Sequence, residues 1–252
     1  RLYRNDPSWV HPLLYEQRHY LSPGQPLFQH LSWQAWLAWR GGRIVGRIAA
    51  QVDALHQQRY QDASGFFGLY EGEDGAEVPQ TLFEVAEKWL REQGMRRLLG
   101  PYNLSINAEC GLLVDGFNTP PSIMMGHARP CYERQFLDSG LSPCKDLLAY
   151  RVRPDFVAPA VMTRLANKAA PRIRVRCFDR GRKGDELELL RDIFNDAWSA
   201  NWNFLPFTPD EFAEIGQSMI MLIDDDFIQI AELDGEPVAF IIAMPNINEI
   251  LA

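Results

Sequence analysis

The polar side chains most able to recognise a substrate lie in one long stretch, residues 102–128, which has no clear periodicity. A polar loop of this length in a compact domain is usually functional or disordered. The apolar pieces at 112–114 and 123–125 argue against disorder. The candidate substrate-binding residues are Asn103, Ser105, Asn107 and Glu109. The alternative is a loop whose side chains satisfy its own backbone.

Cysteine and metal chemistry have less support in the sequence. Cys110 has no histidine near it along the chain, so a buried thiol is the simpler interpretation. The four cysteines form no Cys-x-x-Cys pair and have no histidine partner at metal-ligand spacing. The consecutive carboxylates 224–226 cannot all face one ion, and we expect an exposed turn there. No metal site is predicted.

Composition and charge exclude several classes of protein. The chain has 252 residues, of which 46% are hydrophobic and 23% charged, as in ordinary globular proteins. A formal net charge of −8 argues against nucleic acid as a partner, because binding it needs a basic surface. No apolar run approaches the roughly 18–20 residues of a membrane-spanning helix. We interpret the cysteines as reduced. Together with the absence of such a run, reduced cysteines predict a cytoplasmic protein.

The first half of the chain alternates between strand and helix patterns. The predicted elements are strands 33–40, 43–53 and 64–71, a helix 79–94, a strand 95–100, a helix 130–139 and a strand 145–152. Gly41 and Gly42 are typical of a hairpin turn between the first two strands. The strand, helix and strand from 64 to 100 should form a right-handed parallel crossover.

A shift in composition marks the expected domain boundary. We predict a first domain at 1–153, a linker at 154–171 that is rich in Pro, Ala and basic residues, and a second domain beginning at 172. The second domain, 172–252, restarts the pattern: a strand, two helices, and a hairpin turning at Asp234-Gly235. The chain begins without Met or a signal-peptide pattern, so we expect it to be a piece of a longer protein.

This order of elements resembles the GNAT (GCN5-related N-acetyltransferase) superfamily. Several strings also resemble a bacterial group of tandem GNAT-like proteins that includes relatives of bacterial ceramide synthases. These strings are Tyr3–Val10, Gly46–Ala49, Gly65–Gly68, Gly100–Asn103, Glu109–Phe117, Lys145–Tyr150 and Asn195–Trp198. The resemblance implies an α+β fold with a mixed central sheet flanked by helices. It also implies that 172–252 is the incomplete start of a second GNAT-like domain.

The resemblance further implies an N-acyltransferase, which moves an acyl group from an acyl-CoA thioester to an amine. Its partners would be acyl-CoA and an amine acceptor, with peripheral membrane contact through a lipid substrate such as a sphingoid amine. The strand backbone at Phe67, Gly68 and Leu69 would orient the thioester. Gly75 and Ala76 would match the loop that holds the coenzyme A pyrophosphate at a helix start.

Two side chains match family positions for acid–base catalysis. Glu71 would be the base at the end of the cofactor strand, and Tyr132 the acid near the thiolate. The alternatives are a carboxylate that favours a helix start for Glu71, and a packing role for Tyr132.

The sequence departs from the family in the pyrophosphate loop. The family typically has Gln/Arg-x-x-Gly-x-Gly/Ala there. This chain has acidic side chains at Glu71, Glu73, Asp74 and Glu77. These carboxylates would repel a polyphosphate, and Pro79 lacks an N–H donor. The alternative function is therefore a non-catalytic scaffold or substrate-binding half of a tandem protein, whose cofactor site lies beyond residue 252.

Overall fold

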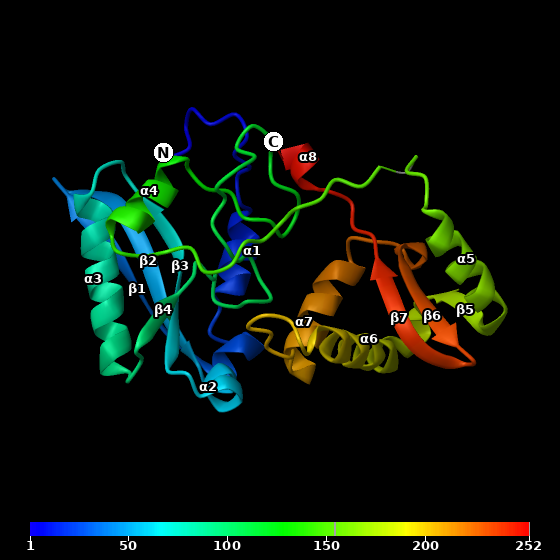
Figure 1. Cartoon of the computed structure of the whole chain (residues 1–252). Helices are drawn as coiled ribbons and strands as arrows, with labels where there is room; N and C mark the ends of the chain where they lie inside the picture. Colours follow the sequence, from blue (N-terminus) through cyan, green and yellow to red (C-terminus); the bar gives the residue numbers. More distant parts are fainter. Residues whose placement is uncertain (154, 252) are drawn as a thin grey trace. The chain divides into compact units, whose positions relative to one another are not determined.

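A computed structural model describes residues 1–153 and 155–251, and divides them into two compact units (Figure 1). Unit 1 comprises residues 1–146 and the C-terminal segment that begins at Asn246. Unit 2 comprises Leu147–Pro245. Helix α5 (Ala160–Ala169) lies within the segment that the sequence predicts to be a linker.

Unit 1 is built on a four-stranded sheet in the order β1-β2-β3-β4. The strands are β1 (Leu31–Arg40), β2 (Arg43–Asp53), β3 (Ser64–Gly72) and β4 (Arg97–Leu99). The first three pair antiparallel, and β3 pairs parallel with β4. The predicted α+β class with a mixed sheet is confirmed, and the GNAT identity of the fold stays a prediction.

The helices of unit 1 include α2, which the sequence patterns did not indicate. They are α1 (Leu14–Tyr20), α2 (Ala54–Tyr60), α3 (Glu77–Glu92), α4 (Cys131–Asp138) and α8 (Asn248–Leu251). Helix α2 was not predicted. It begins where the side chain of Asp53 accepts hydrogen bonds from the backbone N–H groups of Leu55 and His56, which is the function of an N-cap residue.

Helix α3 covers the sheet with one apolar face. Its buried residues are Val78, Pro79, Leu82, Phe83, Ala86 and Leu90. All of them except Pro79 pack in one cluster with Ile48 of β2 and Phe67 of β3. Burying one Val, Leu or Phe side chain stabilises the fold by roughly 1.5–3 kcal/mol. The strand–helix–strand segment is therefore a main source of the stability of unit 1.

Strand β3 contains one extra residue. Arg47 pairs with Glu71 and Ala49 pairs with Gly68, so two residues of β3 lie opposite Ile48 alone. The first of them, Leu69, has a φ of 49°. Such a bulge shifts the alternation of side chains. Phe67 and Tyr70 are three positions apart, yet both rings contact Phe83 and Phe136.

One predicted strand is absent. Residues 145–152 form no strand, and Leu147, Leu148 and Tyr150 are exposed. An alternating sequence forms a strand only when a neighbouring strand supplies hydrogen-bond partners. None of the strands within 1–153 and 155–251 pairs with this segment. The strand predicted at 95–100 is present but shorter, as β4.

Unit 2 has a smaller antiparallel sheet in the order β5-β6-β7. Its strands are β5 (Ile173–Cys177), β6 (Ile228–Leu233) and β7 (Glu236–Ile242), and its longer helices are α6 (Lys183–Trp198) and α7 (Pro209–Ile220). Helix α7 begins with a capping box between Thr208 and Glu211. The apolar faces of α6 and α7 pack with Ile228 and Ile230 of β6 in one core.

Short 3-10 helices complete the two units. They lie at Pro26–Gln29, Ala170–Arg172, Arg180–Arg182 and Asp225–Phe227.

The close approach at Gly68 gives a test of the fold. A Cβ atom at this position would lie 1.7 Å from the carbonyl oxygen of Tyr102. We expect Gly68→Ala to lower the free energy of unfolding by about 3 kcal/mol, the upper end for overpacking, in chemical denaturation followed by circular dichroism. Gly126→Ala is the control, because a Cβ there meets nothing within 4 Å. Equal stability of the two variants would contradict the packing at β3.

Candidate functional site

The structure brings Glu71 and Tyr132 together. Glu71 lies near the end of β3, and Tyr132 lies in the first turn of α4. The Tyr132 hydroxyl donates a hydrogen bond of 2.6 Å to Oε2 of Glu71. The backbone N–H of Gly72 donates to the Tyr132 oxygen over 3.1 Å. The two residues that the resemblance assigns to catalysis are therefore joined by a direct hydrogen bond.

Two further side chains surround the Glu71 carboxylate. The Tyr3 hydroxyl donates to Oε1 over 3.3 Å, and the Arg47 guanidinium lies 3.8 Å from the same oxygen. Tyr3 comes from the N-terminal segment and Arg47 from β2. The Glu71 side chain is still 22% exposed, whereas Tyr3 and Tyr132 are buried. Of Glu71 and the two tyrosines, Glu71 is thus the one that a substrate could reach.

Both tyrosine hydroxyls are held as neutral donors. Burial raises the pKa of Tyr132 far above its usual range, and the negative charge of Glu71 raises it further. The same two causes raise the pKa of Tyr3. Each hydroxyl therefore keeps its proton and directs it at the carboxylate.

A second set of hydrogen bonds fixes the backbone that follows Glu71. The Tyr70 hydroxyl donates to Oε1 of Gln135 over 2.8 Å, and Nε2 of Gln135 donates to the carbonyl of Glu73 over 2.9 Å. Arg129 donates to the carbonyl of Gly72 over 3.0 Å. Helix α4 and Arg129, two residues before its start, thus hold the end of β3 in place.

The acidic loop after β3 is paired with arginines. Glu73 contacts Arg1, Arg40 and Arg43, and Arg40 also lies 2.7 Å from Glu77. Asp74 lies 3.2 Å from Arg129. A polyphosphate here would have to displace these ion pairs. Gly75 in this loop has a φ of 110° and open space around it, and Ala76 precedes α3 with no side-chain cap.

The strand backbone that we expect to orient a thioester already forms hydrogen bonds with other residues of the chain. The carbonyl of Phe67 accepts a hydrogen bond of 2.7 Å from the N–H of Tyr102. The N–H of Leu69 donates to Oδ1 of Asn103 over 2.8 Å. Residues 102–103 therefore lie along the segment Phe67, Gly68 and Leu69.

The predicted substrate-binding residues bond to one another. Nδ2 of Asn103 donates to Glu109 over 3.0 Å, and Oγ of Ser105 accepts from the backbone N–H of Asn107 over 3.1 Å. These bonds satisfy groups within the loop, and a substrate-binding role for the four residues stays a prediction.

The chemical patterns of the sequence missed the N-terminal residues beside Glu71. Besides Tyr3, the same segment contains Asp6, whose Oδ2 lies 2.8 Å from Nε2 of His127. His127 is buried, and its Nδ1 has no hydrogen-bond partner among the described residues. The rings of His127 and Tyr3 are 5.8 Å apart. The one available signal was the string Tyr3–Val10, which carried the family resemblance but no chemistry.

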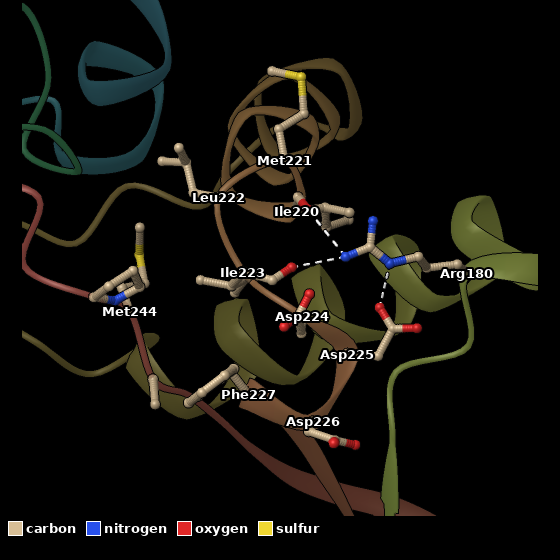
Figure 2. Close-up of a pocket in the computed structure, with 12 residues that line it drawn as sticks. Arg180, Ile220, Met221, Leu222, Ile223, Asp224, Asp225, Asp226, Phe227 and Met244 are labelled. Carbon is tan, nitrogen blue, oxygen red and sulfur yellow. Dashed lines mark hydrogen bonds and ion pairs between the residues drawn. The ribbon is translucent and has the colours of Figure 1, made fainter.

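A separate cleft of about 750 Å³ lies in unit 2 (Figure 2). Its lining comes from Arg180, from residues 220–227 and from residues 243–245, and it contains none of the predicted site residues.

Across the described residues, no group of three or more His, Cys, Asp or Glu side chains is placed to hold a metal ion. Nor does any helix there have the length and apolar character needed to cross a membrane.

Two curated proteins are similar to this chain along its whole length. Protein YghO of Escherichia coli strain K12 is 43% identical over 252 residues, and the bacterial ceramide synthase of Caulobacter vibrioides is 40% identical over 259 residues. The chain spans 65% and 66% of the lengths of these relatives. No protein-family model matches the chain, and no solved structure matches it.

Cys131, beside the acid–base pair, gives a test of the local electrostatics. Burial and a hydrogen bond to Asp74 raise the pKa of its thiol to about 11. At pH 8 only about one molecule in a thousand would carry the thiolate, so iodoacetamide should label Cys131 roughly 100-fold more slowly than an ordinary thiol. The labelling rate, followed by peptide mass spectrometry, should rise about tenfold per pH unit as the pH approaches 11.

Asp74→Asn should accelerate this labelling, because it removes the negative charge that raises the Cys131 pKa. Asp115→Asn is the control, since Asp115 is exposed and, among the described residues, bonds only to the N–H of Gly116. Fast labelling of Cys131 at pH 8 in the unmodified chain would contradict the arrangement. Exposed Cys144 serves as the internal reference.

Proposed function

We propose that this chain takes part in transfer of an acyl group from a thioester to an amine, with Glu71 as the base. The observation that carries the proposal is the Glu71 carboxylate itself. It is partly exposed, and it is held by hydroxyl groups of Tyr132 at 2.6 Å and Tyr3 at 3.3 Å. The name of the Caulobacter relative supports the reaction class, because ceramide is an N-acyl amide.

The proposed reaction balances without a covalent enzyme intermediate. The amine nitrogen attacks the carbonyl carbon of the thioester, a C–N bond forms, and the C–S bond breaks. Glu71 accepts the proton that the nitrogen loses and then passes it to the departing thiolate. The products are an amide and a thiol, and Glu71 returns to its starting form. General base catalysis of this kind typically contributes 10²–10⁴-fold to the rate.

For Tyr132 we propose that it holds Glu71 rather than donating its proton to sulfur. Its hydroxyl is buried, and its pKa is raised so far that it is a poor acid. Its hydrogen bond holds Oε2 of the Glu71 carboxylate, whose side chain stays 22% exposed. Arg47 adds a positive charge on the same side, within 3.8 Å of Oε1.

For the acyl donor we propose a coenzyme A thioester and, for unit 1, a GNAT-like fold. The second candidate function is a substrate-binding or scaffold half whose cofactor site lies outside this chain. A specific observation favours it, because the N–H of Leu69 already donates to Asn103. Calorimetry with palmitoyl-CoA decides between the two. Micromolar binding to the folded 252-residue chain supports a cofactor site in unit 1, and absence of binding supports the second candidate.

The catalytic assignment is tested in the protein that carries this chain. With acyl-CoA and a long-chain amine, and amide formation followed by mass spectrometry, Glu71→Gln should lower kcat by about 10²–10⁴-fold. Tyr132→Phe should lower it by only about tenfold, because the base remains. It should also cost about 1–3 kcal/mol of stability for the buried groups left unpaired.

Tyr150→Phe is the matched control, because Tyr150 is exposed. Full activity of Glu71→Gln would overturn the assignment. An equally large loss in Tyr132→Phe, with stability retained, would instead make Tyr132 the proton donor.

A further inference from the structure

Strand β1 forms an open edge of the unit 1 sheet. The order β1-β2-β3-β4 leaves one side of β1 without a neighbouring strand. Among the described residues, the backbone of Leu31–Arg40 forms hydrogen bonds with no segment other than β1 itself and β2. The outer side of this strand of ten residues therefore presents backbone N–H and C=O groups that can pair with a strand of another chain.

The other three sheet edges carry features that prevent such pairing. Strand β4 has only three residues, β5 carries Arg174 and Arg176, and β7 contains Pro237. Short length, charge and proline are the means by which proteins protect sheet edges. From residue 31 to residue 39, β1 contains neither proline nor a charged side chain, and Arg40 at its end is paired with Glu77. Among the edges in the described residues, β1 is the one without protection.

Two large apolar side chains of β1 are exposed beside this edge. Leu37 is 52% exposed and Trp39 is 62% exposed. Both lie on the sheet face opposite α3, because the alternate residues Trp36 and Ala38 pack against the core beneath that helix. Burial against a partner is more favourable for such side chains than contact with water.

The sequence of β1 is complementary to itself. In an antiparallel pair with its two-fold axis at Trp36, apolar residues face apolar residues, with Trp33 opposite Trp39 and Ala35 opposite Leu37. Aromatic pairs on adjacent strands stabilise a sheet, whereas like charges directly opposite each other destabilise it. The one charged residue of β1 lies at the end of the strand, so no like charges face each other in this pair.

Helix α3 leaves room for such a pair. It packs more extensively against β2 than against β1 or β3. In a continuous sheet of two copies, the two β2 strands are three strand spacings apart, or roughly 14 Å. Packed helices need roughly 8–10 Å between their axes, so the two copies of α3 do not collide. The rings of Trp36 and Trp89, whose centroids are 6.3 Å apart, lie toward the space between them.

From these observations we propose that β1 is a dimerisation strand. Two copies of this chain pair antiparallel along Leu31–Arg40 and join their four-stranded sheets into one continuous sheet. Both copies use the same edge, so the assembly is symmetric and closes at two chains. The proposal rests on unit 1 alone and is independent of the proposed function.

The test is the mass of the whole 252-residue chain in solution, measured by sedimentation equilibrium over a range of concentrations. The mass should rise with concentration to twice the 28.9 kDa of one chain. Ala35→Lys combined with Leu37→Lys should raise the Kd of the dimer at least about 100-fold, because the added charges face each other across the pair. Leu14→Lys combined with Tyr15→Lys is the control, since it adds the same charge at exposed positions of α1 and should leave the Kd unchanged.

Cross-linking tests the register of the pair. The background carries Cys144→Ser and Cys177→Ser, because these two cysteines are exposed. Ala35→Cys combined with Leu37→Cys should form disulfides between two chains under mild oxidation, because directly opposite Cβ atoms lie about 4.5–5.5 Å apart. With Ala35→Cys alone, the two thiols lie diagonally, their Cβ atoms roughly 7–8 Å apart, and should cross-link at least about tenfold more slowly.

A monomer at every concentration would overturn the proposal. A dimer whose Kd is unchanged by the combined Ala35→Lys and Leu37→Lys substitutions, with the thermal midpoint retained, would place the contact on another surface and also overturn it. If these substitutions lower the thermal midpoint, the cross-linking rates decide. Equal rates for the double and the single cysteine variant would reject the pairing along β1.

Discussion

The extra residue in β3 determines which side chains meet in unit 1. Without it, Phe67 and Tyr70 would point to opposite faces of the sheet, because side chains alternate along a strand. With it, both rings pack against Phe83 of α3 and Phe136 of α4. The end of β3 is then held against α4 by the hydrogen bond from Tyr70 to Gln135, and Glu71 lies within hydrogen-bond distance of Tyr132. The core and the candidate site therefore depend on one local change of register.

Local sequence patterns predicted single helices and turns better than they predicted which strands find a partner. The apolar spacing of Leu82, Phe83, Ala86 and Leu90 predicted α3, and the Gly41-Gly42 turn predicted the first hairpin, because both depend on neighbours in sequence. The segment 145–152 had the pattern of a strand, but a strand also needs a partner. Helix α2 was missed although Asp53 marks its start.

The candidate site shows the same division. Family resemblance, not spacing, selected Glu71 and Tyr132, and the structure shows that they form a hydrogen bond. The contacts from Tyr3 and from the Asp6–His127 pair could not be predicted, because they join positions about 70 to 120 residues apart. The acidic loop shows the same limit. Its carboxylates can be found in the sequence but their partners cannot, and Glu73 alone contacts three arginines, which come from the N-terminus, β1 and β2.

The side-chain amide of Asn103 forms hydrogen bonds through both its oxygen and its nitrogen. Its oxygen accepts from Leu69, and its nitrogen donates to Glu109. Exchange of that nitrogen for oxygen, as in spontaneous deamidation, would replace a donor with a second carboxylate facing Glu109. The attraction to Glu109 would become repulsion, whereas the bond from the Leu69 N–H would persist, because a carboxylate oxygen also accepts it. The bond between Asn103 and Glu109 within the loop is therefore sensitive to chemical ageing of a single side chain, and aged preparations would differ from fresh ones in this loop.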